Sequence, residues 1–162
     1  MLLAIDPGTN SFGLALFDIP SGKLAHATTL VTDPKGCTVQ RLVNVHSLVY
    51  NAMGTTKITD IAVEFYPKSQ IPFIAIGAIL AGLTNCTAQI SKTCLVTPTS
   101  WKAYVKRCKD LTKPLPEVIK GIAALECMGL DIAVDSDDAA DAVLIGLCWL
   151  DKKRTSQKKP RK

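Results

Sequence analysis

Short apolar runs and stretches with helical spacing alternate along this 162-residue chain. Apolar runs bounded by turn-forming residues predict strands, and we expect five, over residues 2–6, 12–18, 24–32, 60–64 and 93–97. Helical spacing of apolar residues and capping residues predict helices, which we expect over residues 38–54, 70–86, 101–108, 117–128 and 137–150. The first three strands follow one another, and the last two alternate with helices. This order predicts an α/β fold with one mixed five-stranded sheet, three antiparallel strands followed by parallel ones, and helices on both faces.

Charge divides the chain into two parts. Residues 1–150 carry 12 basic and 13 acidic side chains, whereas residues 151–162 carry seven basic side chains and one acidic. The length fits one domain, which we place at residues 1–150. Because the segment DKKRTSQKKPRK has no apolar residue, we expect residues 151–162 to form a disordered basic tail. Such a tail either solubilises the protein or binds a polyanion, since each Lys or Arg near a phosphate releases a counterion.

Hydropathy argues against membrane insertion and export. The longest uncharged stretch, residues 69–91, has an apolar centre at residues 71–83, which is shorter than the roughly 20 residues of a membrane-spanning helix. The N-terminus has no basic segment and meets an acid at Asp6, so it lacks the pattern of a signal peptide. Six cysteines form no CxxC pair, which indicates a reducing, cytoplasmic setting and argues against a zinc site.

Four acidic residues lie where the predicted fold would bring them together. Asp6 and Glu64 end strands after the apolar runs LLAI and IAV, and Asp138 and Asp141 share one face at the start of the last helix. Ligands bind at the carboxyl ends of adjacent parallel strands in such sheets. An Asp at a helix start is also an ordinary cap, but two carboxylates 4 Å apart repel by about 4 kcal/mol at an effective dielectric constant of 20. The group therefore predicts bound Mg²⁺ or Mn²⁺, and two such ions can promote phosphodiester hydrolysis.

Three short motifs resemble one known family. They are Asp6-Pro7-Gly8-Thr9 with Gly13, the strand end Ala62-Val63-Glu64, and Asp138-Ala139-Ala140-Asp141-Ala142. Their order and spacing are similar to those of the RuvC family of Holliday-junction resolvases, and the resemblance covers residues 1–150. It implies a ribonuclease H-like fold in which four catalytic acids bind the divalent metals, here Asp6, Glu64, Asp138 and Asp141.

The resemblance also implies basic and aromatic residues that act on DNA. The family has two active-site lysines separated by eleven residues, as Lys102 and Lys113 are. The glycine-rich stretch that usually precedes the second lysine is replaced here by RCKDLT, so Lys109 remains an alternative to Lys113. An aromatic residue after the second acid contacts junction bases in the family, and we assign Phe73 to the core instead. The expected DNA contacts are Phe65, Tyr66, Lys68, Lys102, Lys106, Arg107, Lys109, Lys113, Lys152, Lys153 and Arg154.

We therefore interpret the chain as a crossover junction endodeoxyribonuclease of DNA recombination and repair. The resemblance implies a metal-dependent, structure-selective enzyme that resolves four-way junctions by symmetric paired nicks, leaving 3′-hydroxyl and 5′-phosphate ends. Two cuts need two active sites, so we expect a C2 homodimer, with the helix over residues 71–83 as the interface candidate. Its substrate places it with intracellular DNA, and the altered loop and the cysteine content suggest a viral or organellar source.

Three other functions remain open at this point. The first motif also resembles the phosphate loop of sugar kinases and actin-like ATPases, which need a second domain for which 162 residues leave no room. A related ribonuclease H-like nuclease could act on other branched DNA or on RNA. A junction-binding module without activity would not need all four acids.

Overall fold

The computed structural model describes residues 1–8, 10–33, 35–53, 56–65, 71–84, 90–108, 111–114, 116 and 119–157. The strands in this part of the chain are β1 (Leu2–Asp6), β2 (Ser11–Phe17), β3 (Leu24–Val31), β4 (Asp60–Glu64) and β5 (Lys92–Val96). The helices are α1 (Thr38–Met53), α2 (Ile71–Thr84), α3 (Pro98–Arg107), α4 (Gly121–Cys127) and α5 (Asp137–Gln157). The predicted element order is confirmed.

One five-stranded sheet with the order β3-β2-β1-β4-β5 forms the centre of the molecule. Strands β1, β2 and β3 pair antiparallel, whereas β4 pairs parallel to both β1 and β5. This is the predicted mixed sheet. Its parallel part places the carboxyl ends of β1, β4 and β5 at one edge, which is where ligands bind in sheets of this kind.

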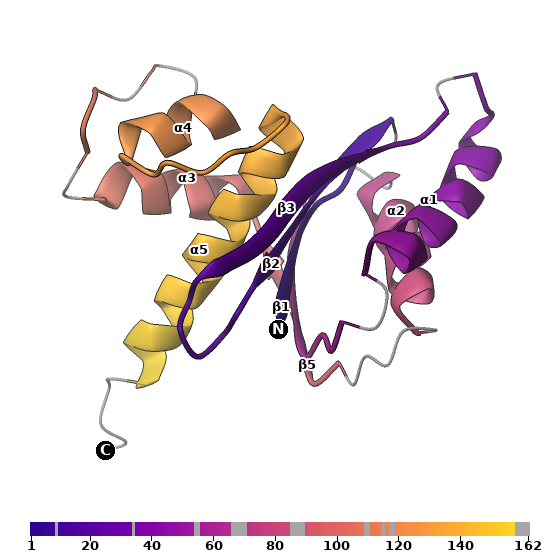
Figure 1. Ribbon diagram of the computed structural model, residues 1–162, viewed down its shortest axis with the longest axis horizontal. Coiled ribbons are helices and arrows are strands. Elements are labelled where there is room, and N and C mark those ends of the chain that lie inside the picture. The colour runs from indigo at the N-terminus through magenta and orange to yellow at the C-terminus, as the bar shows by residue number, and fades with distance from the viewer. Residues whose placement is uncertain are drawn as a thin grey trace.

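Helices cover both faces of the sheet. Figure 1 shows α1 and α2 on one side and α3, α4 and α5 on the other. Side chains alternate between the faces along each strand: Leu3 and Ile5 of β1 pack with α1 and α2, whereas Leu2 and Ala4 pack with the opposite helices. The two apolar layers follow from the uninterrupted apolar runs, which are typical of strands buried on both faces.

Small residues bring α5 close to the sheet. Buried alanines of both elements belong to this contact: Ala4, Ala15, Ala62, Ala140 and Ala142. At Gly13 a Cβ atom would lie 1.8 Å from the main-chain oxygen of Asp138, and at Gly146 it would lie 2.2 Å from the Phe17 ring. Only glycine permits these approaches, so the first turn of α5 rests directly on β2.

Three predictions about the helices were wrong. Helix α3 begins at Pro98 and not at residue 101. Helix α4 begins at Gly121 and not at residue 117, since residues 119 and 120 are not helical. Helix α5 continues beyond Leu150 to Gln157, so residues 151–157 are not a disordered tail. Lys and Arg favour helix, and a helix that is already formed extends without a new nucleation cost.

Contacts with the sheet hold this extension in place. Lys153 Nζ lies 3.7 Å from Asp60 Oδ1 and 4.6 Å from the centre of the Trp149 ring. Arg154 donates a hydrogen bond to the main-chain oxygen of Ser21 at 3.3 Å. Among the described helices, none is both long enough and apolar enough to span a membrane.

Candidate active site

Two of the predicted acids lie side by side at the carboxyl edge of the sheet. Asp6 ends β1 and Glu64 ends β4, and the parallel register pairs Ile5 with Val63, the residues directly before them. Because alternate residues share a face, both side chains are on the side of Ala4 and Ala62, which α5 covers. Glu64 is only 1% exposed, which is rare for an unpaired acid.

Gly13 brings the other two acids to the same place. The strand register pairs Asp6 with Gly13, and Gly13 is the residue on which the main chain of Asp138 rests. Ala139 and Ala140 point into the core and are fully buried. Asp138 and Asp141, three residues apart, therefore face the end of β1 together.

Electrostatic interactions link the four carboxyl groups. Burial raises the pKa of Asp6 to about 9, and repulsion by Glu64, a hydrogen bond with Glu64, and the charges of Asp141 and Asp138 add to the effect. Burial also raises the pKa of Asp141 to about 7, again with repulsion from Glu64, while Lys102 acts in the opposite direction. Protons shared within the group thus limit its negative charge.

Hydrogen-bond donors from two other elements hold two of the acids. The indole Nε1 of Trp101, in α3, donates to Glu64 Oε1 at 2.6 Å in a buried contact. The hydroxyl of Ser11, at the start of β2, donates to Asp138 Oδ2. Sequence reasoning missed both residues. The available signals were the position of Trp101 next to Lys102 and of Ser11 between Thr9 and Gly13 of the first motif.

Asp141 carries an oxygen for which the described structure offers no donor. Its Oδ1 atom is buried without a hydrogen-bond partner, and α4 covers it so closely that a Cβ on Gly121 would lie 2.7 Å away. A buried unsatisfied carboxylate oxygen costs free energy. A bound cation would compensate this cost by contacting the oxygen.

The donor set fits a hard divalent cation. All four side chains present carboxylate oxygens, the ligands that Mg²⁺ and Mn²⁺ prefer. Within the described residues, no three His, Cys, Asp or Glu side chains are already arranged so that one metal ion could contact them all. Asp6 and Glu64 instead share a hydrogen bond, and Asp138 accepts one from Ser11.

The two predicted active-site lysines differ in their surroundings. Lys102 lies with Nζ 5.1 Å from the centre of the Trp101 ring, and its charge lowers the pKa of Asp141. Lys113 forms an ion pair with Glu126 at 3.3 Å, and both side chains are largely exposed. The structure thus brings Lys102 to the acids, while Lys113 is engaged with Glu126.

The remaining predicted DNA contacts occupy three places. Lys106 and Arg107 are exposed in the last turn of α3. Phe65 is half-buried after β4, with its main-chain N–H donating to Val96 O at 2.9 Å. Lys152, Lys153 and Arg154 lie near the other end of the sheet, about 20 Å from the first turn of α5 at 1.5 Å per residue. Tyr66, Lys68 and Lys109 lie outside the described residues, as does the side chain of Phe73.

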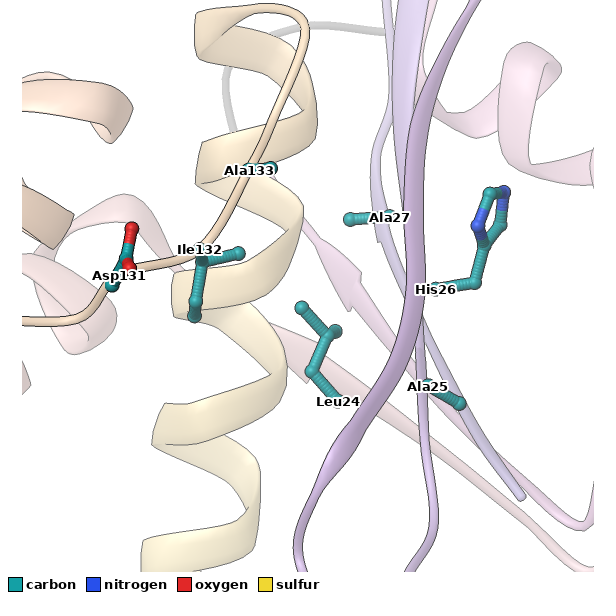
Figure 2. Close-up of a pocket in the computed structure, with 7 residues that line it drawn as sticks. All are labelled: Leu24, Ala25, His26, Ala27, Asp131, Ile132 and Ala133. Atoms are coloured by element: carbon teal, nitrogen blue, oxygen red, sulfur yellow. The ribbon is translucent and has the colours of Figure 1, made fainter.

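A surface pocket elsewhere on the molecule does not involve the acids. It lies between β3 and residues 131–133 (Figure 2). Leu24 and Ala27 point toward Ile132, whereas His26 points away from it to the other side of the strand. The lining offers no group of polar side chains directed at a common point, so the acids at the end of β1 remain the candidate active site.

The sheet order, the helices on both faces and the acid positions define a ribonuclease H-like fold. The chain is similar to RuvC of Thermus thermophilus in complex with a Holliday junction substrate, with a TM-score of 0.68 and 22% identity over 99% of this chain and 98% of the other. A second structure of Thermus thermophilus RuvC matches with a TM-score of 0.64 and 21% identity over 99% of both chains.

A viral protein has the same fold. The fowlpox virus resolvase in complex with substrate Holliday junction DNA matches with a TM-score of 0.52 and 14% identity, over 94% of this chain and 99% of the other. No protein-family model and no curated protein sequence match the chain. The predicted fold is therefore confirmed by structural likeness over nearly the whole length.

Proposed function

We propose that this protein is a divalent-metal-dependent endonuclease that cuts four-way DNA junctions. The observation that carries the proposal is the convergence of Asp6, Glu64, Asp138 and Asp141 at one end of the sheet, with an unsatisfied oxygen on Asp141. Structures of this fold include RuvC and a poxvirus resolvase with Holliday junction DNA. Because the structural likeness to these proteins extends over nearly the whole chain, we propose four-way junction DNA as the substrate and phosphodiester cleavage as the reaction.

The four acids would hold the metal, Mg²⁺ or Mn²⁺, with two ions per site as the proposed number. Such ions activate water and stabilise the leaving oxygen of a phosphodiester. The protein contributes the positions of the acids. Glu64 is held by Trp101 and Asp138 by Ser11, so two of the four carboxylates are oriented before any ligand arrives.

The basic side chains of α3 would bind the DNA backbone next to the acids. Lys102 lies closest to them, and Lys106 and Arg107 continue the positive charge along the helix. A phosphate beside Lys102 would have its developing charge stabilised by the ammonium group. Water attack on phosphorus then breaks the P–O3′ bond, which leaves a 3′-hydroxyl and a 5′-phosphate.

Symmetric resolution requires a second copy of the site. One chain has one such group of acids among its described residues, so paired nicks on opposite strands need a C2 homodimer. Helix α2 is the proposed interface, because its exposed residues in the described part include Gly77 and Ala81, which allow close approach. A junction substrate would put the site of action in the cytoplasm, at the nucleoid or other intracellular DNA.

Cleavage assays on defined substrates test the proposal. We expect Asp6→Asn, Glu64→Gln and Asp141→Asn to lower the rate of junction cleavage in Mg²⁺ by at least about 100-fold. Loss of a residue that only hydrogen-bonds to a metal ligand costs about 10–100-fold in affinity or activity, and loss of the ligand itself should cost no less. Junction binding should persist, because the phosphate contacts come from lysines and arginines. The matched control is Asp131→Asn, an exposed acid outside the group.

The substrate panel separates this function from the alternatives. Four-way DNA is compared with duplex, flap and RNA–DNA hybrid substrates under the same conditions. Preferred cleavage of flaps or hybrids would indicate another ribonuclease H-like nuclease. Undiminished cleavage by Asp6→Asn would contradict the assignment of the site, and junction binding without cleavage by the wild type would indicate a binding module.

A further inference from the structure

The indole of Trp101 makes a hydrogen bond that a core tryptophan does not need for packing. The ring is 1% exposed and lies in the apolar layer between the sheet and α3, α4 and α5. Its Nε1 atom reaches Glu64 Oε1 at 2.6 Å, and both partners are buried. The contact joins α3 to the end of β4, 37 positions apart in the sequence.

The chemistry of the pair gives the contact a direction. An indole N–H can donate and cannot accept, so the Glu64 oxygen that faces it must act as an acceptor. Glu64 has other carboxyl groups for neighbours, including Asp6, with which it shares a hydrogen bond. Without the indole N–H, Glu64 Oε1 would lose this donor, and the hydrogen bond from α3 would no longer fix the carboxylate relative to the neighbouring acids. With it, Oε1 is held, and the orientation of the whole carboxylate follows.

The next residue in the helix strengthens the arrangement. Lys102 Nζ lies 5.1 Å from the centre of the Trp101 ring, a distance at which a cation is attracted to an aromatic face. The same lysine acts electrostatically on Asp141. Neighbouring residues of α3 thus reach two different acids, one by a neutral donor and one by a charge.

We propose that Trp101 is a positioning residue that orients Glu64 for the divalent cation, and this inference rests on the proposed function. Trp101 does not contact the reacting atoms and acts through Glu64. Loss of its N–H should weaken metal binding even where the fold is retained. Partners of this kind typically contribute 10–100-fold to metal affinity.

The test compares Trp101→Phe with Trp149→Phe, which changes the second of the two tryptophans in the sequence. Trp149 is also buried but contacts Lys153, far from the acids. Mn²⁺ binding to the full-length protein is measured without DNA, by the electron paramagnetic resonance signal of free Mn²⁺, beside the melting temperature of each variant. We expect about 10-fold weaker binding by Trp101→Phe and unchanged binding by Trp149→Phe. In the Glu64→Gln background, Trp101→Phe should cause no further loss.

Two results separate the inference from the function on which it rests. If Glu64→Gln loses Mn²⁺ while Trp101→Phe binds it as the wild type does, Trp101 only fills the core and the inference is overturned. If Glu64→Gln binds Mn²⁺ with wild-type affinity, the proposed metal site itself is wrong. A loss of affinity in Trp101→Phe that persists in full on top of Glu64→Gln would also overturn the inference, because the effect would not pass through Glu64.

A second measurement covers the case in which Trp101→Phe does not fold. In Trp149→Phe, Trp101 is the one remaining tryptophan and reports on its own surroundings by fluorescence. We expect the Trp101 emission to change as Mn²⁺ is added and to saturate at the same Mn²⁺ concentration as the binding curve. In the double variant Trp149→Phe/Glu64→Gln, Mn²⁺ should leave the emission unchanged. Emission that does not respond to bound Mn²⁺ would overturn the inference.

Discussion

Gly13, which has no side chain, decides where two of the four acids lie. A methyl group there would lie 1.8 Å from the main-chain oxygen of Asp138, so any other residue would push the start of α5 away from Asp6. Asp138 and Asp141 would then lie farther from Asp6 and from the end of β1. The acids and the residues that let them approach are equally part of the site.

The raised pKa values predict that the metal-free protein loses stability as the pH rises. Between 3.8, the ordinary pKa, and about 9 for Asp6 or about 7 for Asp141, the folded state holds protons that the unfolded state has released. The free energy of unfolding therefore falls as the pH rises through this window. Asp6→Asn removes the larger of these two effects, so its melting temperature in EDTA should exceed that of the wild type at pH 8.

Thermal unfolding between pH 5 and pH 8 measures this effect. Each 1 kcal/mol corresponds to about 2–4 °C in a domain of this size, and we expect the gap between Asp6→Asn and the wild type to widen with pH by at least that amount. Added Mg²⁺ should stabilise the wild type at high pH by binding the folded state. Parallel pH curves for the two proteins in EDTA would contradict the shared-proton description.

Lys102 and Lys113 should respond differently to removal. Lys102 acts on Asp141, so Lys102→Ala should lower the single-turnover cleavage rate by about 100-fold, the lower end of the range for a lost electrostatic donor. Lys113 is paired with Glu126 at an exposed position, and such pairs contribute about 0–1 kcal/mol to stability. Its predicted catalytic role requires that the pair with Glu126 opens on DNA binding.

Single-turnover rates and junction affinities of the two alanine variants decide between these roles. If Lys102→Ala cleaves at the wild-type rate, Lys102 has no catalytic role and is an ordinary charged surface residue. A rate loss in Lys113→Ala as large as that in Lys102→Ala would show that the loop with Lys113 moves to the acids. If only affinity falls, the lysine is a phosphate anchor, and the salt dependence of binding should flatten by about 0.9 per lost contact.

At the scale of elements, α5 connects the acids to the basic end of the chain. Its first turn carries Asp138 and Asp141, and its last turns carry Lys153 and Arg154, which contact Asp60 and the Ser21 carbonyl. Asp60 begins β4 and Glu64 ends it. The helix thus runs the length of the sheet, and the bases of its C-terminal end lie at the edge opposite to the proposed active site.

Two truncations distinguish the structural from the DNA-binding part of this segment. Ending the chain after Gln157 removes the sequence KKPRK and leaves α5 whole. We expect an unchanged melting temperature and weaker binding to all DNA shapes, because phosphate contacts carry no information on shape or sequence. Ending it after Asp151 also removes the contacts of Lys153 and Arg154, and it should lower the melting temperature by about 2–4 °C, as for a loss of roughly 1 kcal/mol.

Melting curves and binding across a salt series check both truncations. Equal melting temperatures for the two shortened chains would show that the helical extension adds no stability. If the chain ending at Gln157 binds junctions and duplex with wild-type salt dependence, the last five residues only add solubility. Loss of junction binding alone would mean that the segment recognises shape.

At the scale of the whole molecule, the proposed activity needs a geometry that one chain does not supply. The two nicks of a resolution event lie on opposite strands, and a C2 axis relates them. The described part of α2 offers a position for testing the interface, since a Cβ at Gly77 has no atom within 4 Å. A larger side chain there fits the monomer and would obstruct only a partner.

Gly77→Arg should therefore give a folded monomer that nicks but does not resolve junctions. Size-exclusion chromatography with light scattering should give about twice the chain mass of 17.4 kDa for the wild type and once that mass for the variant. The matched control is Gln40→Arg, which adds the same side chain at an exposed position of α1. A dimeric Gly77→Arg would place the interface elsewhere, and a monomeric wild type that makes paired nicks would contradict the need for a dimer.

Local patterns along the chain determined most of the architecture. The apolar runs LLAI and IAV are buried on both faces, so they form central strands wherever the chain places them. An acid that directly follows such a run lies at the end of its strand, which is why the sequence alone predicts that Asp6 and Glu64 are neighbours. The spacing of Asp138 and Asp141 similarly places them on one helix face by the geometry of the α-helix alone.

Contacts between distant segments decided what the sequence left open. Trp101 and Glu64, or Ser11 and Asp138, are recognised as pairs only after the sheet has brought α3 and α5 to the same edge. Residues 151–157 look like a solvated tail because they contain no apolar residue, yet Asp60 and the Ser21 carbonyl hold them in α5. Local sequence records propensity and polarity, whereas hydrogen bonds and ion pairs between residues tens of positions apart depend on where the folded sheet places both partners.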